Sequence, residues 1–287
     1  MKILLAVDGS DESYEAVRAL KYLSRAEAFH ILHVLDVPTP AYPMMVPEVA
    51  HELQAAVVQQ MQDDGKRLLD RMVSLLPMDV GPVTTHMEIG APADRIVDYA
   101  ATHQIGLILL GARGLGPIKE RLMGSVSHRV LTHAPCPTLI LPSFMKSLKR
   151  VLLPIQGSHD AEQAVRFLQQ QPFREPVAFT ILTVLPYTTP PWPVDAEAAK
   201  QLEREALRSA EAFFTTVVPQ LTQMGHTAQA KAVLGSPADM ILRESQALNP
   251  DVVMLGSRGR HGLTRIVLGS VSHTVLHRSS HPLLVYH

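Results

Sequence analysis

The stretch GARGLGPIKERLMGSVS, residues 111–127, decides the fold. It follows an apolar run, residues 107–110, that is typical of a buried strand, and it leads into an amphipathic segment at 125–133. The same pattern recurs near the C-terminus as GSRGRHGLTRIVLGSVS, residues 256–272. Glycines between a strand and a helix let backbone N–H groups approach an anion, and the first turn of the helix adds unpaired donors. We therefore expect a phosphate-binding loop in each half of the chain.

The whole chain reads as two copies of one unit. ILLAVDGSDES from Ile3 corresponds to VLLPIQGSHDA from Val151, and GSVSHRVL from Gly124 corresponds to GSVSHTVL from Gly269. The repeat is far longer than a solenoid unit of roughly 20–50 residues. The sequence therefore predicts two domains in tandem, at 1–143 and 149–287.

Short apolar runs alternate with longer helical patterns in each copy. Strands are expected near 2–8, 29–37, 82–89, 106–111 and 137–141, and again near 150–156, 177–186, 226–234, 251–256 and 282–286. Helices are expected near 11–26, 47–76, 92–103 and 124–133, and again near 159–171, 195–224, 237–247 and 269–277. Runs rich in Ile, Val and Leu without alternation indicate parallel strands covered on both faces. The pattern predicts an α/β fold of two doubly wound, Rossmann-like domains, each with a five-stranded parallel sheet.

Local signals add three expectations about the helices. Asp11 is expected to cap the first helix, and Gly65 to break the second. Pro219 is expected to kink or stop the counterpart of the second helix in copy two.

Composition excludes several classes of function. A formal net charge of −1 gives no reason to expect nucleic acid or an anionic membrane as a partner. The single Cys136 excludes an internal disulfide framework and is expected to be an inert, buried thiol. The first apolar run is too short for a signal peptide, and no run has the length of a membrane span, so a cytoplasmic location is expected. The 14 histidines show no HExxH spacing and are interpreted as scattered polar residues without a metal.

The glycine pattern resembles that of a known family. Gly, two residues, Gly, nine residues and Gly-Ser, with a first strand that ends in Asp-Gly-Ser, resembles the universal stress protein family in its ATP-binding subclass. The resemblance covers both copies and so points to the tandem form. It implies a Rossmann-like fold related to the adenine nucleotide alpha hydrolases, with the two domains related by a pseudo-two-fold axis. The same resemblance implies that the last strands of the two copies, Leu139–Leu141 and Leu283–Val285, pair and form an internal pseudo-dimer. It also implies a nucleotide-dependent regulatory role in the stress response, exerted through a protein partner.

The resemblance implies an ATP site in copy one. Asp8 would bind the ribose hydroxyls, and the backbone of Val34 would contact the adenine. The phosphates would lie against Gly111, Gly114, Gly124, Ser125, Val126 and Ser127. Mg²⁺ or Mn²⁺ would be held mainly by the phosphates and water. Arg113 has two open interpretations, a phosphate contact and a solvated loop arginine.

Copy two matches this site with one departure. The matching residues are Val184, Gly256, Arg258, Gly259, Gly269, Ser270, Val271 and Ser272. Gln156 stands where copy one has Asp8, and an amide is a weaker acceptor than a carboxylate. Because loss of a charge-assisted hydrogen bond costs on the order of 1–3 kcal/mol, we expect site one to bind ATP more tightly than site two.

Two other functions stay open beside a nucleotide-binding regulator. One is an enzyme of the same fold class that hydrolyses ATP slowly or transfers adenylyl groups. No catalytic residue is assigned for it, because the chain lacks a P-loop lysine, a GxSxG elbow and a candidate general base. The other is an interaction module whose nucleotide sites are vestigial. Whether two chains form a homodimer is also open.

Overall fold

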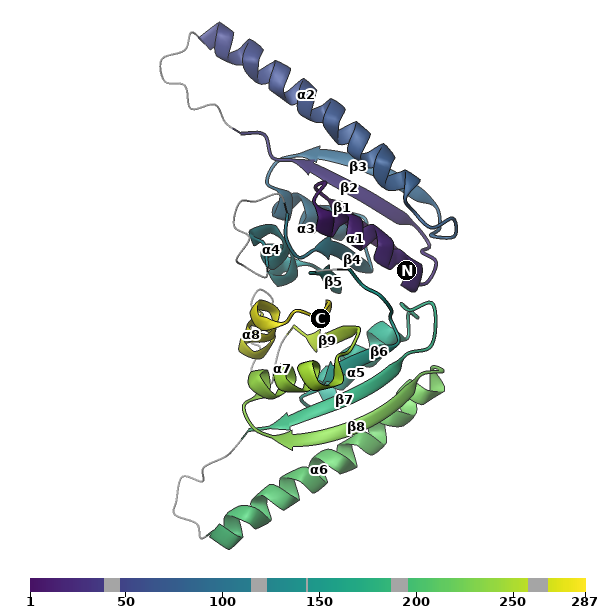
Figure 1. Ribbon diagram of the computed structural model, residues 1–287, viewed down its shortest axis with the longest axis vertical. Helices are drawn as coiled ribbons and strands as arrows, with labels where there is room; N and C mark the ends of the chain where they lie inside the picture. The colour runs from purple at the N-terminus through teal and green to yellow at the C-terminus, as the bar shows by residue number, and fades with distance from the viewer. Residues whose placement is uncertain (39–46, 115–122, 143, 187–195, 258–267) are drawn as a thin grey trace.

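The computed structural model describes residues 1–38, 47–114, 123–142, 144–186, 196–257 and 268–287. Figure 1 shows strands and helices alternating through both halves. The first half contains β1 (Ile3–Val7), α1 (Asp11–Ala19), η1 (Leu20–Tyr22), β2 (Phe29–Leu35), α2 (Pro47–Ser74), β3 (Val83–Ile89), α3 (Pro92–Thr102), β4 (Leu107–Gly111), α4 (Ser125–His133) and β5 (Thr138–Leu141). The second half contains β6 (Arg150–Pro154), α5 (Ser158–Leu168), β7 (Ala178–Leu185), α6 (Ala196–Gln223), β8 (Thr227–Leu234), α7 (Pro237–Leu248), β9 (Val252–Gly256), α8 (Ser270–Arg278) and β10 (Leu283–Tyr286).

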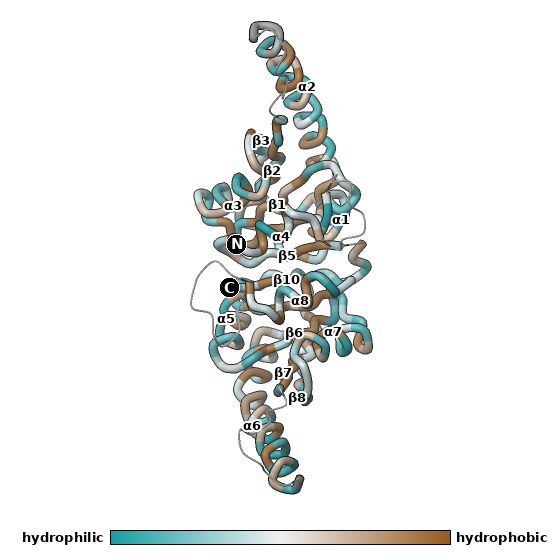
Figure 2. The backbone as a smooth tube through the Cα atoms, turned by 90° about the vertical axis from the view of Figure 1, so that its left-hand side faces the viewer, coloured by the Kyte–Doolittle hydropathy of each residue, from teal (hydrophilic) through white to brown (hydrophobic). Residues whose placement is uncertain are grey.

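All the strands join one ten-stranded sheet of order β3-β2-β1-β4-β5-β10-β9-β6-β7-β8. Neighbouring strands are parallel within each half, and only β5 and β10 are antiparallel, with Leu283 opposite Ile140 and Leu284 opposite Leu139. Counted inward from either edge, the order passes through corresponding strands of the two halves, with β8, β7, β6, β9 and β10 matching β3, β2, β1, β4 and β5. A pseudo-two-fold axis at the β5–β10 seam requires this order. Figure 2 shows these two strands side by side at the middle of the elongated molecule. The expected doubly wound α/β fold and the pairing of the last strands are confirmed.

Each face of the sheet has its own hydrophobic core. On β1, Ile3 and Leu5 pack with α1 and α2, whereas Leu4 and Ala6 pack with α3 and α4. In the second half α5 and α6 cover the first face, and α7 and α8 cover the second (Figure 1). Because both faces are covered, alternate residues of the inner strands such as β1, β4 and β9 are equally apolar, whereas the edge strands β3 and β8 keep exposed polar residues.

Two local expectations about the helices, at Asp11 and Gly65, are wrong, and of the kink or stop expected at Pro219 the stop is wrong. Ser10, not Asp11, is the N-cap of α1, because its side chain accepts a hydrogen bond from the Ser13 N–H. Helix α2 continues through Gly65, where a Cβ would lie 2.9 Å from the His33 ring, so the glycine allows close packing on the sheet. Helix α6 continues through Pro219, which lies on its exposed face, where water can satisfy the carbonyl that loses its donor.

The two halves also meet away from the strand seam. The Arg174 side chain donates to the Leu23 carbonyl at 3.2 Å and forms an ion pair with Asp79 at 2.9 Å. The connection between the halves is fixed by Asp251, which accepts hydrogen bonds from the Ser147 hydroxyl and from two backbone N–H groups, at 149 and 150. Burial acts to raise the pKa of Asp251, but these hydrogen bonds outweigh it and hold the pKa below its usual range.

Two expectations from composition can be compared with the structure. Cys136 is buried, and burial raises the pKa of its thiol to about 12, which confirms an unreactive thiol. Within the described ranges, none of the helices combines the length and the apolar character that crossing a membrane requires.

Candidate functional site

The first candidate site lies where the strand order of the first half reverses. β1 has β2 on one side and β4 on the other, and the connections from these strands leave toward opposite faces of the sheet. Ligands of doubly wound folds bind at the carboxyl ends of the strands at such a point. Asp8 follows β1 directly, and Gly111 ends β4. The topology therefore brings these two predicted residues to one edge of the sheet.

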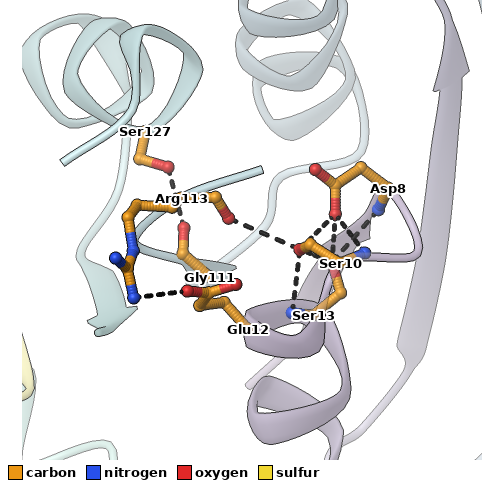
Figure 3. A network of polar contacts seen from close by, with 7 residues as sticks. All are labelled: Asp8, Ser10, Glu12, Ser13, Gly111, Arg113 and Ser127. Carbon is orange, nitrogen blue, oxygen red and sulfur yellow. Dashed lines mark hydrogen bonds and ion pairs between the residues drawn. The ribbon is translucent and has the colours of Figure 1, made fainter. Parts of the chain in front are cut away.

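Asp8 is held by the first turn of α1 (Figure 3). Its Oδ1 accepts hydrogen bonds from the Ser10 N–H at 3.0 Å, from the Ser10 hydroxyl at 2.6 Å and from the Ser13 hydroxyl at 2.6 Å. The Asp8 N–H in turn donates to the Ser13 Oγ at 3.1 Å. Among the described residues no donor reaches Oδ2, so one carboxylate oxygen fixes the side chain and the other is available to a ligand.

Two of the glycines are required by their neighbours. A Cβ at Gly114 would overlap with the Oδ2 of Asp8, so only a glycine lets the loop pass beside the carboxylate. A Cβ at Gly111 would lie 2.6 Å from the Cβ of Glu12, because β4 ends against the start of α1. Both glycines thus have a packing reason that needs no ligand.

Gly124 is different, because nothing in the described structure demands a glycine there. Its φ of −78° suits any residue, and a Cβ would come no nearer than 3.4 Å to the Ala112 carbonyl. It is the N-cap of α4, and no side chain caps this helix. The hydroxyl of Ser127 donates to the Gly111 carbonyl at 2.8 Å, which ties the helix start to the end of β4. A Cβ at residue 124 would make ordinary van der Waals contacts with the described residues, and the helix start itself, which no side chain caps, can bind an anion.

Arg113 has a partner within the protein. Its guanidinium forms an ion pair with Glu12 at 2.7 Å, and 38% of the Arg113 side chain is exposed (Figure 3). The backbone carbonyl of Arg113 also accepts a 3.4 Å hydrogen bond from the Ser10 hydroxyl. The ion pair fixes the arginine at the rim of the site, beside the start of α1.

Val34 lies one residue beyond the end of the β1–β2 ladder. The register of these strands stops at Val7 opposite His33, and the Leu35 carbonyl accepts from Gly90 on the β3 side. Because main-chain groups alternate along a strand, the Val34 carbonyl points to the other side, past the end of β1. Its position agrees with the expected backbone contact to a ligand beside Asp8.

The sequence prediction missed part of this site. Ser10, Glu12 and Ser13 belong to the network that orients Asp8 and Arg113. Their signal was present in the spacing DGSDES, which puts three polar side chains on the first turn of a helix after a strand-end carboxylate. Ser125 and Val126 lie, as expected, in the first turn of α4.

The second half has a different arrangement after β6. Gln156 is exposed, and its backbone N–H donates to the Asp160 carboxylate at 3.1 Å. The other oxygen of Asp160 accepts from the hydroxyl of Tyr286 at 2.9 Å, and Tyr286 is fully buried. Burial raises the pKa of Asp160 against the effect of these hydrogen bonds, and burial next to Asp160 raises that of Tyr286. A carboxylate is thus present, but it is directed into the protein.

The helix start of the second half repeats that of the first. The hydroxyl of Ser272 donates to the Gly256 carbonyl at 2.6 Å, and Gly269 caps α8 without a side-chain cap. Ser270 and Val271 lie in the first turn of α8. Val184 lies beyond the β6–β7 ladder, whose register stops at Leu182. Arg258 and Gly259 lie outside the described residues.

The histidines are not all scattered, which corrects the interpretation made from spacing. Three of them gather with Tyr99 between β2, β3 and α3, namely His30, His86 and His103. Burial lowers the pKa of His30 and His86 and raises that of Tyr99 to about 12. A second group, His128, His273 and His277, lies between α4 and α8.

Comparison with known proteins agrees with this architecture. The model of the universal stress protein family matches residues 1–142 and again residues 147–287. The chain belongs to the universal stress protein family. It is a tandem member, because each half matches the family model separately.

Relatives that match the whole chain and relatives that match one half both support the family. Universal stress protein Rv2623 of Mycobacterium tuberculosis is 28% identical over 96% of this chain and 94% of its own length. Universal stress protein YxiE of Bacillus subtilis is 30% identical over 49% of this chain and 97% of its own length, so it corresponds to one half. The crystal structure of a universal stress protein from Archaeoglobus fulgidus has a TM-score of 0.61 at 21% identity, covers 99% of this chain and 95% of its own, and shows the shared fold.

Proposed function

We propose that this tandem universal stress protein binds ATP in its first half and acts as a nucleotide-dependent regulator in the stress response. One observation carries the proposal. The Oδ2 of Asp8 accepts no hydrogen bond from the described residues and lies beside Gly114, which is close to Gly124, where α4 begins without a side-chain cap. A ribose diol needs such an acceptor, and phosphates need such a helix start.

The groups at this edge fit the parts of an adenine nucleotide in order. In this proposal the carbonyl of Val34 contacts the base, Oδ2 of Asp8 the ribose and the first turn of α4 the phosphates, which is supported by the position of all three at one edge of the sheet. Arg113 adds a positive charge at the rim. The divalent cation, Mg²⁺ or Mn²⁺, would be held mainly by the phosphates and water, since the Glu12 carboxylate at this edge is already paired with Arg113.

The second half is proposed to bind ATP more weakly. Gln156 offers no carboxylate, and Asp160 is already engaged by Tyr286 and by the backbone. Unequal sites suit a regulator in which one half responds to nucleotide and the other serves mainly as its structural partner.

Calorimetric titration of nucleotide-stripped protein with Mg-ATP tests the proposal. We expect one tight equivalent per chain for the wild type. Asp8→Asn keeps an acceptor for Ser10 and Ser13 but replaces the free oxygen with an NH₂ group, so ATP affinity should fall about tenfold to a hundredfold. Asp11→Asn is the matched control, because it removes the same charge from an exposed position in the same turn, and it should bind ATP like the wild type.

The outcomes separate the three functions left open by the sequence. An absence of binding in the wild type would leave only the interaction module. Equal affinities of wild type and Asp8→Asn would remove Asp8 from the ribose site. Steady turnover of ATP by the purified protein would favour the enzyme over the regulator.

A further inference from the structure

A group of three histidines lies on the seam between the two halves. His128 comes from α4, and His273 and His277 come from α8. Figure 1 shows these helices facing each other across the seam, although they are far apart in the sequence. One nitrogen from each ring can be chosen so that the three atoms all lie within 4.8 Å of one another.

The internal symmetry explains why two of these rings meet. His128 and His273 hold the same place in GSVSHRVL and GSVSHTVL, so the pseudo-two-fold axis brings them together, with ring centroids 5.5 Å apart. The third ring belongs to one copy alone, because His277 stands where copy one has Thr132. His273 and His277 are four residues apart on one helix, and therefore share a face, with centroids 4.5 Å apart.

We propose that His128, His273 and His277 bind a divalent transition-metal ion of the Zn²⁺ class across the domain seam. Three imidazole nitrogens are a ligand set that suits Zn²⁺, Co²⁺, Ni²⁺ or Cu²⁺, not Mg²⁺ or Ca²⁺. Zn–N bonds of about 2.0–2.1 Å place tetrahedral ligands about 3.4 Å apart, so small rotations of the exposed rings of His273 and His277 complete the geometry.

An unsatisfied atom points to the same site. The Nε2 of His128 is buried and has no hydrogen-bond partner in the described structure. Buried polar atoms are nearly always paired, so an unpaired nitrogen on an imidazole that lies 5.5 Å and 5.3 Å, between ring centroids, from His273 and His277 calls for a ligand. The exposed positions of His273 and His277 give an ion a path from solvent, and a water molecule would take the fourth position.

The ion would connect the two glycine loops. The backbone N–H groups of His128 and His273 donate to the carbonyls of Gly124 and Gly269, the residues that begin α4 and α8. A metal bound to both histidines would therefore hold the two helix starts at a fixed separation. This binding does not depend on ATP, because none of the three rings belongs to the proposed nucleotide site.

Metal titration of the full chain without nucleotide tests the site. The protein is made free of any histidine tag, treated with EDTA and titrated with Zn²⁺ by calorimetry and with Co²⁺ by visible absorption. We expect one equivalent per chain and the intense d–d bands of four-coordinate Co²⁺. His273→Ala and His277→Thr should each weaken Zn²⁺ binding at least about tenfold and abolish the Co²⁺ bands. His277→Thr is the milder change, because it installs the residue of copy one.

His159→Ala is the matched control, since His159 is an exposed histidine of α5, which packs on the face of the sheet opposite to α4 and α8. It should bind Zn²⁺ and Co²⁺ like the wild type. Circular dichroism checks that each variant is folded. We expect that it is, because His273 and His277 are exposed. Absence of four-coordinate Co²⁺ bands in the wild type, or equal Zn²⁺ affinities of the wild type and the two seam variants, would overturn the proposal. Neither result bears on ATP binding, which is measured separately.

Discussion

The two halves share their glycine spacing but use the residue after their first strand differently. In the first half Asp8 is oriented by Ser10 and Ser13 through one oxygen, and its other oxygen accepts no hydrogen bond from the described residues. In the second half the matching Gln156 is exposed, and the nearby carboxylate of Asp160 is bonded to the protein. The same loop can therefore surround a site prepared for a ligand or one in which the polar groups satisfy each other. The comparison teaches that the glycines alone do not define a nucleotide site.

The largest expected effect comes from Gly124→Ala. The added methyl group meets no close neighbour, so the free energy of unfolding should change by less than about 1 kcal/mol. It would occupy the space above the start of α4, and the loss of two hydrogen bonds to a phosphate should weaken ATP binding about a hundredfold. Calorimetry and thermal unfolding of the same sample measure both quantities.

Gly269→Ala is the counterpart of this change in the second half, at a φ of −59°. It should leave the tight equivalent of ATP untouched. If Gly269→Ala abolished the tight site and Gly124→Ala did not, the assignment of the two halves would be reversed.

A smaller effect is expected from rebuilding the second site. Gln156→Asp alone adds a carboxylate next to Asp160. The new carboxylate would have no counterpart of the Ser13 hydroxyl to orient it, because Ala161 stands where the first half has Ser13. The pair Gln156→Asp with Ala161→Ser supplies both, and it should raise ATP affinity at the second site about tenfold, as one charged hydrogen bond allows. Titration shows this as a second resolved equivalent. An unchanged second site would mean that Asp160 and Tyr286, not Gln156, keep nucleotide out.

The smallest effect is expected at Arg113. Its side chain is partly exposed and paired with Glu12, and such ion pairs contribute about 0–1 kcal/mol. Arg113→Gln should weaken ATP binding less than about fivefold, with a reduced dependence on salt. A loss as large as that of Asp8→Asn would show that Arg113 leaves Glu12 to bind the phosphates directly.

Sequence reasoning predicted the fold well because the patterns of the strands and helices are local and occur in both copies of the repeat. Each strand and α-helix of one copy is repeated in the other, and the pairing of 139–141 with 283–285, which the family resemblance implied, is observed. The errors at Gly65 and Pro219 have one cause. Intrinsic helix propensity is weak compared with packing on the sheet and hydration of an exposed face, and neither can be read from the local sequence.

The candidate site could be predicted only in part. The positions of Asp8 and Gly111 follow from the topology, but the engagement of Asp160 by Tyr286 joins residues 126 apart in the sequence. The histidine group on the seam was missed for the same reason, since His128 lies in one copy and His273 and His277 in the other. Two signals were present, the repeated histidine after GSVS and the spacing of four in HTVLH.

The antiparallel seam between β5 and β10 has a consequence for the stability of the joined sheet at low protein concentration. Two separate domains that pair through these strands would dissociate on dilution. Here the connection fixed by Asp251 tethers them, and a short tether gives an effective concentration in the mM range. The joined sheet therefore persists on dilution, even where only a few copies of the chain are present.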